Sequence, residues 1–389
     1  MNEPKPGLET TRYSMAHEVS TITIIGPLPP PRGGVSIHIA RLEQMLREDG
    51  VRVRILPWAG VAGRSLLVRI LLSLRQLVKI AWFVPAAGES TVHLHYSHLV
   101  GFFALAPWIL LAKSRWVLTL HSVKLFDECD RAPSWRRQLV RKLLRRFALV
   151  ICVRLGIAEK IRRLDLPDVE TLIMPAFLPP SFAERETTLL AADLREEIAR
   201  YRRAGTLLLF CAAYNLGAAY GKDDVYGVEM LVDLLIAVGR QLTRQICLVV
   251  MVSYRPFGPA ALAAERIARR SADVDYLHVD LRVNEPLVPG LAVADAFLRP
   301  SREDGDSVAI REALDVGCPV WASDAVERPP GCVVFPLGDR EQAQRSLQAF
   351  LEGLPPEPEI GRARGSDLTQ YRDFIARLLG RTKDDTAPQ

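Results

Sequence analysis

The sequence predicts an α/β protein built from two doubly wound, Rossmann-like domains that face a central cleft. The chain has 389 residues, which is enough for about two domains of ordinary size. Short apolar runs alternate with segments of helical periodicity along most of this length, a pattern typical of parallel sheets with helices on both faces. The proline-rich segment 175–182 interrupts the alternation, which then starts again and so divides the chain into two series.

The first α/β series opens with a β-branched run at residues 21–26 that ends in a glycine, a pattern that predicts a buried strand. A loop follows at 26–34, and apolar residues then recur at helical spacing from Val35 onward. The further strands of this series are expected at residues 51–58, 91–96, 115–121 and 148–153. Its helices are expected at residues 35–49, 65–84, 99–113 and 134–146.

The second series follows a charged helix that is expected at residues 189–203. Its strands are expected at residues 206–213, 246–253, 276–279, 296–300, 319–323 and 332–335. Its helices are expected at residues 226–241, 259–271, 308–316, 341–352 and 368–379. Two such series leave a cleft between the carboxyl ends of two parallel sheets, and this is where ligands bind in open α/β folds.

These boundaries predict a loose N-terminal tail over residues 1–20 and an N-terminal Rossmann-like domain over residues 21–185. A C-terminal Rossmann-like domain is expected over residues 186–360. Residues 361–389 are expected to form a helix and a polar tail, and packing of that helix on the N-terminal domain is left open.

Composition and charge exclude several classes of protein. Hydrophobic residues make up 49% and charged residues 24% of the chain, which excludes a wholly disordered or collagen-like protein. Six scattered cysteines without a CxxC pair predict free thiols in a reducing compartment, and no secretory signal is visible, so a cytoplasmic location is expected. The apolar segment 65–84 contains Arg69, Arg75 and Lys79, whose cost in hydrocarbon argues against a membrane-spanning helix but not against an interfacial one.

The strongest chemical signal is a short strand, an acidic loop and a helix in direct succession. Asp304 lies in the loop, and Glu312 lies eight residues later inside the helix. Carboxylates accept paired hydrogen bonds from vicinal hydroxyls, and the free amides at a helix start suit a phosphate. An isolated pair of acids at this spacing is more often a solvated surface feature. The amides at the helix start are those of Gly305, Ser307 and Val308.

A double glycine, Gly33 and Gly34, lies between the first strand and the first helix. Since glycine has no Cβ, the backbone can approach a ligand closely here, and the helix N-terminus behind it offers amides to a diphosphate. A plain turn could carry the same two residues. The G-x-G-x-x-G pattern of dinucleotide sites is absent, which disfavours NAD.

Together these segments resemble the family-4 glycosyltransferases with the GT-B fold. The family carries the pattern EA-x-x-x-G-x-PV-x-A-S-D after its acidic loop, and this sequence reads EALDVGCPVWASD from Glu312 onward. The family also has a Gly-Gly loop at the place of Gly33 and Gly34, and a histidine at a strand end comparable to that of His121. The first acid of the family pair is a glutamate, whereas this chain has Asp304.

The resemblance implies transfer of a sugar from a nucleotide diphosphate donor, a UDP or GDP sugar, to a hydroxyl acceptor with retention of configuration. It implies no metal and no cofactor. Asp304 would contact the transferred sugar, Glu312 would contact the ribose, and His121 would lie beside the reacting carbon. The N-terminal domain would bind the acceptor, and the C-terminal domain would bind the donor.

One feature of the family is missing. Its members usually place an arginine after the first strand of the second domain and a lysine a few residues later, both on the donor diphosphate. Residues 210–231 contain no arginine, and Asn215 lies in the corresponding loop as a candidate donor contact. Lys222 and Arg299 are candidates to neutralise the diphosphate. A solvated Lys222 in a catalytically weak, nucleotide-sugar-binding relative is the alternative.

The segment HLHYSH, from His93 to His98, contains three histidines. His93 and His95 share a strand face, but no neighbouring aspartate, glutamate or cysteine completes a tetrahedral set, so no metal is expected. His95 and His98 are instead candidates for the acceptor side of the cleft, and burial of His93 is the plain alternative.

Residues 131–146 contain seven basic residues and no acid. Trp135, Leu139, Leu143 and Phe147 form an apolar stripe at four-residue spacing in the same segment. Such a helix either faces the core with a solvated basic side or docks on an anionic bilayer, here beside residues 65–84. Nucleic acid is disfavoured because no recognition motif is present.

The sequence therefore predicts a glycosyltransferase of bacterial surface-polysaccharide biosynthesis that is cytoplasmic or peripheral on the inner face of the cytoplasmic membrane. The expected acceptor is a lipid-linked or oligosaccharide intermediate, such as a polyprenyl-diphosphate-linked sugar. Two alternatives stay open. One is a donor-binding relative without turnover, which the missing Arg/Lys pair favours. The other is a NAD-dependent sugar-nucleotide enzyme, which the glycine pattern disfavours.

Overall fold

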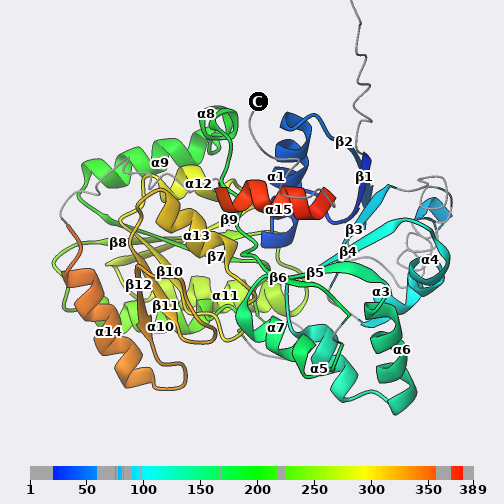
Figure 1. The fold of residues 1–389 in the computed structure, drawn as a ribbon. Helices are drawn as coiled ribbons and strands as arrows, with labels where there is room; N and C mark the ends of the chain where they lie inside the picture. Colours follow the sequence, from blue (N-terminus) through cyan, green and yellow to red (C-terminus); the bar gives the residue numbers. More distant parts are fainter. Residues whose placement is uncertain are drawn as a thin grey trace, which may run out of the picture.

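The computed structural model contains two six-stranded parallel sheets, each with helices on both faces (Figure 1). This confirms the predicted fold class. The structure describes residues 21–58, 75, 78–80, 82, 90–96, 99–166, 168–217, 224–355 and 369–379. The N-terminal tail expected over residues 1–20, most of the helix expected at 65–84, and the polar tail after residue 379 lie outside these ranges.

The sheet of the N-terminal domain has the strand order β2-β1-β3-β4-β5-β6. From β1 the chain continues to β2 on one side of the sheet, and from β3 it continues to β4 on the other side, so the topological switch point lies between β1 and β3. In folds of this kind, ligands bind at the carboxyl ends of the two strands that flank the switch point. The Gly-Gly loop follows β1 directly at this point. The strands are β1 (Thr21–Gly26), β2 (Arg52–Pro57), β3 (Thr91–His95), β4 (Arg115–Leu120), β5 (Phe147–Cys152) and β6 (Thr171–Ile173).

The sheet of the C-terminal domain has the order β12-β11-β10-β7-β8-β9, with its switch point between β7 and β10. The loop that contains Asn215 follows β7, and the loop that contains Asp304 follows β10, so both reach the same edge of the sheet. The strands are β7 (Leu207–Ala213), β8 (Ile246–Val252), β9 (Leu277–Val283), β10 (Ala296–Arg299), β11 (Val320–Ser323) and β12 (Cys332–Phe335).

Most of the predicted helices are present within a few residues of their expected ends. Those before β7 are α1 (Gly34–Glu48), α3 (Leu99–Ala104), α4 (Ala106–Leu111), α5 (Lys124–Asp130), α6 (Ser134–Leu144), α7 (Leu155–Arg162), α8 (Phe182–Thr187) and α9 (Ala192–Arg203). Those after β7 are α10 (Val228–Gly239), α11 (Pro259–Ala272), α12 (Leu287–Leu291), α13 (Val308–Asp315), α14 (Arg340–Glu352) and α15 (Thr369–Leu379).

The helix expected at residues 99–113 is in fact two helices, α3 and α4, which meet at Leu105. Pro107 lies in the first turn of α4, where its missing N–H costs nothing, whereas inside a continuous helix it would remove a hydrogen bond. The short elements α5, α7, α8, α12 and β6 were not predicted, because they are shorter than the window over which periodicity can be read.

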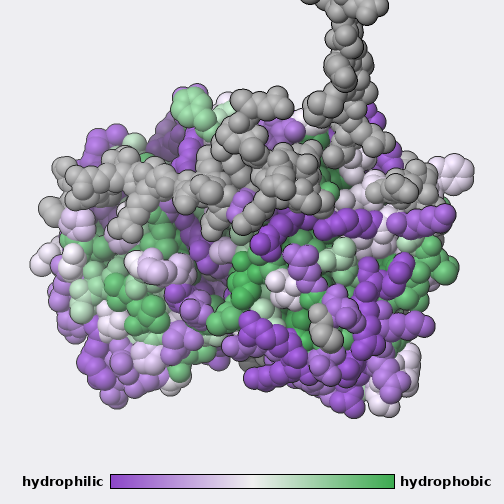
Figure 2. All heavy atoms as spheres, in the orientation of Figure 1, coloured by the Kyte–Doolittle hydropathy of each residue, from purple (hydrophilic) through white to green (hydrophobic). Residues whose placement is uncertain are grey.

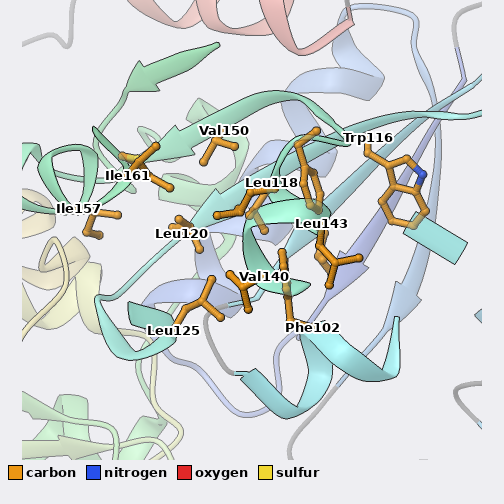
Figure 3. Close-up of a cluster of buried hydrophobic side chains, with 14 of the residues drawn as sticks. Phe102, Trp116, Leu118, Leu120, Leu125, Val140, Leu143, Val150, Ile157 and Ile161 are labelled. Atoms are coloured by element: carbon orange, nitrogen blue, oxygen red, sulfur yellow. The ribbon is translucent and has the colours of Figure 1, made fainter. Parts of the chain in front are cut away.

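The core of the N-terminal domain lies between its sheet and the helices α3 to α7. Figure 3 shows Val140 and Leu143 of α6 pointing toward Leu118 and Leu120 of β4 and toward Phe102 of α3. The apolar side of α6 therefore faces the core, and its basic side is left to solvent.

Helix α15 returns from the end of the chain to the N-terminal domain (Figure 1). Tyr371, Phe374 and Leu378 share one buried cluster with Ile22 and Ile24 of β1. Arg115 at the start of β4 donates from Nη1 to the carbonyl of Leu378 at 2.7 Å. The last helix thus covers the outer face of the first sheet. Within the described residues, no helix is both long and apolar enough to cross a bilayer.

Gly227 offers a sharp test of this fold, because its φ of +70° and its surroundings both exclude a side chain. A Cβ at this position would lie 2.1 Å from the carbonyl oxygen of Pro300, which is backbone and follows β10. Gly205 has almost the same φ, +69°, but no atom within 4 Å of the corresponding point. Replacing Gly205 therefore tests the strain of a left-handed backbone alone, whereas replacing Gly227 tests that strain together with a steric clash.

We predict that Gly205→Ala lowers the free energy of unfolding by about 1 kcal/mol, the cost of a left-handed conformation. Gly227→Ala should lower it by about 2 kcal/mol more, since the β10 loop must move. Urea unfolding of both variants measures the difference. Equal losses in the two variants would contradict the close contact at Pro300.

Candidate functional site in the interdomain cleft

The N-termini of α1 and α13 face each other across the cleft between the two domains. Gly33 caps α1, and Ser307 caps α13 by accepting a hydrogen bond from the amide of Ile310. A Cβ on Gly34 would lie 3.5 Å from Val308, in the first turn of α13. Since each helix N-terminus has a partial positive charge and free amides, two of them so close together provide an environment that favours an anion.

The absence of side chains at two glycines permits this close approach. A Cβ on Gly33 would lie 2.9 Å from the ring of Tyr214, which follows β7. A Cβ on Gly305 would lie 2.2 Å from the backbone oxygen of His121, which follows β4 in the other domain. The predicted residues Gly33, Gly305 and His121 are therefore brought together with the N-terminus of α13.

Glu312 is buried, and its main partner is a residue that sequence analysis missed. Arg41 of α1 donates from Nη2 to Oε1 of Glu312 at 2.6 Å, which joins the two domains. Arg41 also binds Glu184 of α8 through Nε and Nη2 and the carbonyl oxygen of Leu178 through Nη1. Burial raises the pKa of Glu312 above its ordinary value, against the opposing charge of Arg41. The carboxylate predicted to hold the ribose thus lies in the cleft on an interdomain ion pair.

Asp304 is held by two arginines instead of facing an open space. Arg299 donates from Nε and Nη2 to the carboxylate at 3.0 and 3.2 Å, and Arg328 donates from Nη1 at 3.1 Å. Ser301 donates from Oγ to Oδ2 of Asp304 at 3.1 Å. Burial alone would raise the pKa of Asp304, but the charges and hydrogen bonds of the two arginines outweigh it and lower the pKa to about 2. Asp304 is therefore ionised at neutral pH.

The remaining candidates have different surroundings. Arg299 is buried, also donates to the carbonyl of Ala212, and lies 4.9 Å from the ring centre of Tyr226, so its guanidinium is engaged by the protein. Asn215 accepts a hydrogen bond from the amide of Leu216 at 2.9 Å. Lys222 and His98 lie outside the described residues.

Four histidines meet at the carboxyl ends of β3 and β4. His95 Nδ1 and His121 Nε2 are 3.0 Å apart, and His93 Nε2 lies 2.7 Å from the hydroxyl of Thr119. His38 of α1 joins them, with Nδ1 at 2.6 Å from the carbonyl oxygen of Ala176. Burial lowers the pKa of all four rings below the ordinary value, to about 4 for His38, so the rings are uncharged at neutral pH.

Sequence analysis missed Arg41, Arg328 and His38, each of which touches a predicted residue or its neighbours. Arg41 and His38 lie on the same side of α1, at a spacing of three residues, and both are buried. Both lie on the side of α1 that also contains the buried residues Ile39 and Leu42. Polar residues on an apolar helix face are unusual, and this was the sequence pattern that could have identified them. Arg328 lies in a loop without periodicity, and no sequence signal points to it.

The two arginines on Asp304 lead to a prediction about acid stability. The ordinary pKa of aspartate is 3.8 and that of folded Asp304 is about 2, so this group stabilises the fold above about pH 4 and loses that effect as the pH falls toward 2. The difference corresponds to about 2 kcal/mol at neutral pH.

We expect Asp304→Asn to be less stable than wild type at pH 7, because Arg299 and Arg328 lose their buried counter-ion. The gap should narrow by about 1 kcal/mol at pH 3, where part of the wild-type advantage is already lost. Urea unfolding at both pH values measures the gap. A gap that is the same at pH 3 and pH 7 would contradict the arrangement.

Comparison with known proteins supplies the family context for this cleft. Residues 13–176 match the family model described as the glycosyl transferase 4-like domain. No curated protein matches the sequence. Many solved structures are similar in fold.

Three of these structures are similar over nearly the whole chain. The Anabaena protein HepE in complex with UDP and glucose has a TM-score of 0.61 at 14% identity, over 93% of this chain and 99% of that one. Sucrose-phosphate synthase from Thermosynechococcus elongatus has 0.63 at 16% identity, over 92% and 95%. The Escherichia coli trehalose-6-phosphate protein bound with UDP-2-fluoro glucose has 0.65 at 12% identity, over 93% and 100%. These likenesses show the fold.

Residues 13–176 therefore match the model of a glycosyl transferase 4-like domain, and the chain has the GT-B fold over both of its domains.

Proposed function

We propose that the protein transfers a sugar from a nucleotide diphosphate sugar to a hydroxyl acceptor, with retention of configuration. The observation that carries this proposal is the meeting of two helix N-termini, those of α1 and α13, at the Gly34–Val308 contact. A diphosphate is the part of the donor that such a pair of helix ends would stabilise, both in the ground state and as a leaving group.

Glu312 lies further along α13 from this anion site, which suits a ribose attached to the diphosphate. A carboxylate accepts two hydrogen bonds from neighbouring ribose hydroxyls, so Glu312 would share its oxygens between the ribose and Arg41. UDP and glucose occur in the HepE complex and UDP-2-fluoro glucose in the Escherichia coli structure, which favours a UDP sugar as the donor.

Asp304 would orient the transferred sugar. Within the described residues, Oδ2 accepts bonds from Arg299, Arg328 and Ser301, whereas Oδ1 accepts one from Arg299. Oδ1 therefore keeps more capacity for a sugar hydroxyl. Two arginines around one carboxylate leave one surplus positive charge, which would help neutralise the diphosphate in place of the missing Arg/Lys pair.

His121 would lie beside the reacting carbon, at the carboxyl end of β4 in the N-terminal domain. Because residue 305 is a glycine, the loop between β10 and α13 can reach His121, so sugar and imidazole would meet where the two domains touch. The uncharged ring adds no positive charge to a transition state that itself develops positive charge at the sugar.

The test is a panel of UDP, GDP and ADP sugars, with binding measured by calorimetry and donor cleavage measured by release of the free nucleotide diphosphate. A transferase binds one donor and cleaves it slowly even in water. A relative without turnover would bind a donor and leave it intact, and a NAD-dependent enzyme would bind NAD instead. Failure to bind any of the donors would contradict the proposal.

Glu312 and Glu184 form a matched pair for locating the ribose, because both bind Arg41. We predict that Glu312→Gln weakens donor binding by about 10- to 100-fold, the worth of hydrogen bonds to a charged group. Glu184→Gln removes a carboxylate from the same arginine but lies on α8, so donor binding should change by less than about threefold. Calorimetric titration of both variants with the donor measures this. An equal loss of donor affinity in the two variants would show that both act through Arg41, and it would contradict a contact between Glu312 and the ribose.

We further propose that the acceptor is a membrane lipid, such as a polyprenyl-diphosphate-linked sugar of surface-polysaccharide biosynthesis, and that the N-terminal domain docks on the cytoplasmic face of the membrane. Hydrophilic residues gather over the region of α5 and α6 in Figure 2. Trp135 at the start of α6 is 56% exposed, and Leu111 at the end of α4 is 81% exposed. Exposed apolar side chains beside a basic face suit an anionic bilayer surface.

Replacement of four basic residues of α6 tests this docking. The variant Arg136→Gln, Arg137→Gln, Arg141→Gln, Arg145→Gln should bind vesicles with 30% anionic lipid at least ~100-fold more weakly than wild type, at about 1 kcal/mol per removed charge. A control variant removes the same number of exposed arginines from the C-terminal domain and should bind like wild type. The control substitutions are Arg195→Gln, Arg203→Gln, Arg240→Gln and Arg269→Gln. Sedimentation with vesicles measures binding. An equal loss of vesicle binding in both variants would show that binding depends on the net charge of the protein and not on α6, which would contradict the proposed docking.

A further inference from the structure

Four of the seven histidines of the chain gather beside the interdomain cleft. His93 and His95 lie on β3, His121 follows β4, and His38 lies on α1. The function proposed above uses only His121, beside the reacting carbon. An uncharged imidazole has a proton on one ring nitrogen and a lone pair on the other, so what His121 can do depends on which nitrogen has the proton.

His95 and His121 are joined by a hydrogen bond between two ring nitrogens. His95 Nδ1 and His121 Nε2 are 3.0 Å apart. Either His95 donates from Nδ1 and His121 accepts at Nε2, or His121 donates from Nε2 and His95 accepts at Nδ1. The two arrangements place the protons of both rings on opposite nitrogens, and the surroundings of His95 distinguish between them.

The second nitrogen of His95 identifies the donor. Nε2 is buried and has no hydrogen-bond partner among the described residues. If His95 accepted at Nδ1, its proton would be on Nε2, and a buried N–H without an acceptor is rare in proteins. If His95 donates from Nδ1, its proton is hydrogen-bonded and only a lone pair is left without a partner. The geometry therefore favours His95 as the donor and His121 as the acceptor.

The other two rings show the same pattern of one bonded nitrogen and one buried nitrogen without a described partner. His38 Nδ1 lies 2.6 Å from the carbonyl oxygen of Ala176, and because a carbonyl only accepts, this nitrogen has the proton. His93 Nε2 lies 2.7 Å from the hydroxyl of Thr119, which can accept from it. His38 Nε2 and His93 Nδ1 are the buried nitrogens. One rule, a bonded N–H and a buried lone pair, thus accounts for His95 as well.

The ring of His95 is held in place by neighbours from three elements. The ring centre of His93 on β3 is 4.0 Å away, and that of His38 on α1 is 5.3 Å away. A Cβ on Gly26, at the end of β1, would lie only 3.1 Å from the Cβ of His95. Such close packing limits rotation of the ring, so Nδ1 of His95 stays directed at His121.

We propose that His95 is a positioning residue that keeps His121 in the tautomer with its proton on Nδ1. Free histidine prefers the opposite tautomer, with the proton on Nε2, so the hydrogen bond from His95 is needed to hold this form. His121 then offers an N–H at Nδ1, and an oxygen of the transferred sugar that contacts this nitrogen accepts a hydrogen bond. The tautomer is independent of the proposed function, whereas its effect on transfer rests on that function.

Nitrogen magnetic resonance tests the tautomer directly, in full-length protein that has ¹⁵N in its histidines only. The chemical shift of a ring nitrogen separates a protonated from an unprotonated one, and the signals lost in His121→Asn or His121→Gln identify His121. We expect a protonated Nδ1 and an unprotonated Nε2 in His121 at pH 7. A protonated Nε2 would overturn the proposal, whether or not the protein cleaves a nucleotide sugar.

Two variants at position 95 separate the hydrogen bond from the packing of the ring. His95→Asn keeps an amide N–H near the place of Nδ1, whereas His95→Leu fills a similar volume without a donor. We expect His95→Leu to shift His121 toward the Nε2–H tautomer and to lower kcat for donor cleavage about tenfold, while His95→Asn keeps most of both. Donor affinity should stay within about threefold of wild type in both variants, since a group that acts on the reacting sugar changes kcat.

Two variants at position 121 test which nitrogen acts. Asparagine places its N–H near Nδ1 and glutamine places it near Nε2, so His121→Asn should keep a kcat about tenfold higher than His121→Gln. His278→Asn replaces a histidine of β9, outside the cluster, and should match wild type in every measurement. A higher kcat in His121→Gln would overturn the assignment of Nδ1. An unchanged His121 tautomer in folded His95→Leu would overturn the role of His95.

Discussion

The arrangement of the cleft depends on one buried arginine. Arg41 of α1 binds Glu312 of α13 and Glu184 of α8, and it also donates to the chain that leads from the first domain to the second. Burial of a guanidinium is unfavourable unless carboxylates and carbonyls replace its water, and Arg41 has both. Because the α1 and α13 helices are joined at this point, their N-termini are held opposite each other, and the Gly33–Gly34 loop lies against the C-terminal domain. The glycines at 33 and 305 are then required, since a Cβ at either position would collide with the opposite domain.

Sequence alone predicts most of this architecture because the relevant signals are local. Strands such as β7 and β8 are continuous apolar runs, and helices such as α10 and α14 keep one periodic face, so both could be located to within a few residues. The segment that begins at Glu312 and the Gly-Gly loop were found for a similar reason, since each is a short pattern at fixed spacing. The topology then brings both patterns to the carboxyl edges of the two sheets.

The partners of these residues could not be predicted in the same way. Arg41 and Glu312 are 271 residues apart, and nothing in either segment indicates the other. Asp304 was expected to contact the transferred sugar, but its two partners, Arg299 and Arg328, were not predicted, although a buried carboxylate without counter-charges would be costly. The histidine cluster shows the same limit. The segment from His93 to His98 was considered by itself, whereas a further ring of the cluster, His38, comes from α1, and its contacts with His95 and His121 exist only after the sheet has formed.

The central claim is that the diphosphate of a nucleotide sugar binds between the N-termini of α1 and α13. A crystal structure of the protein with the donor selected from the nucleotide-sugar panel tests it most directly. The account predicts diphosphate oxygens within hydrogen-bond distance of the amides around Gly34 and Val308, a ribose on the carboxylate of Glu312, and the sugar between Asp304 and His121. A donor bound at any other place, with the contact between the two helix ends unchanged, would contradict it.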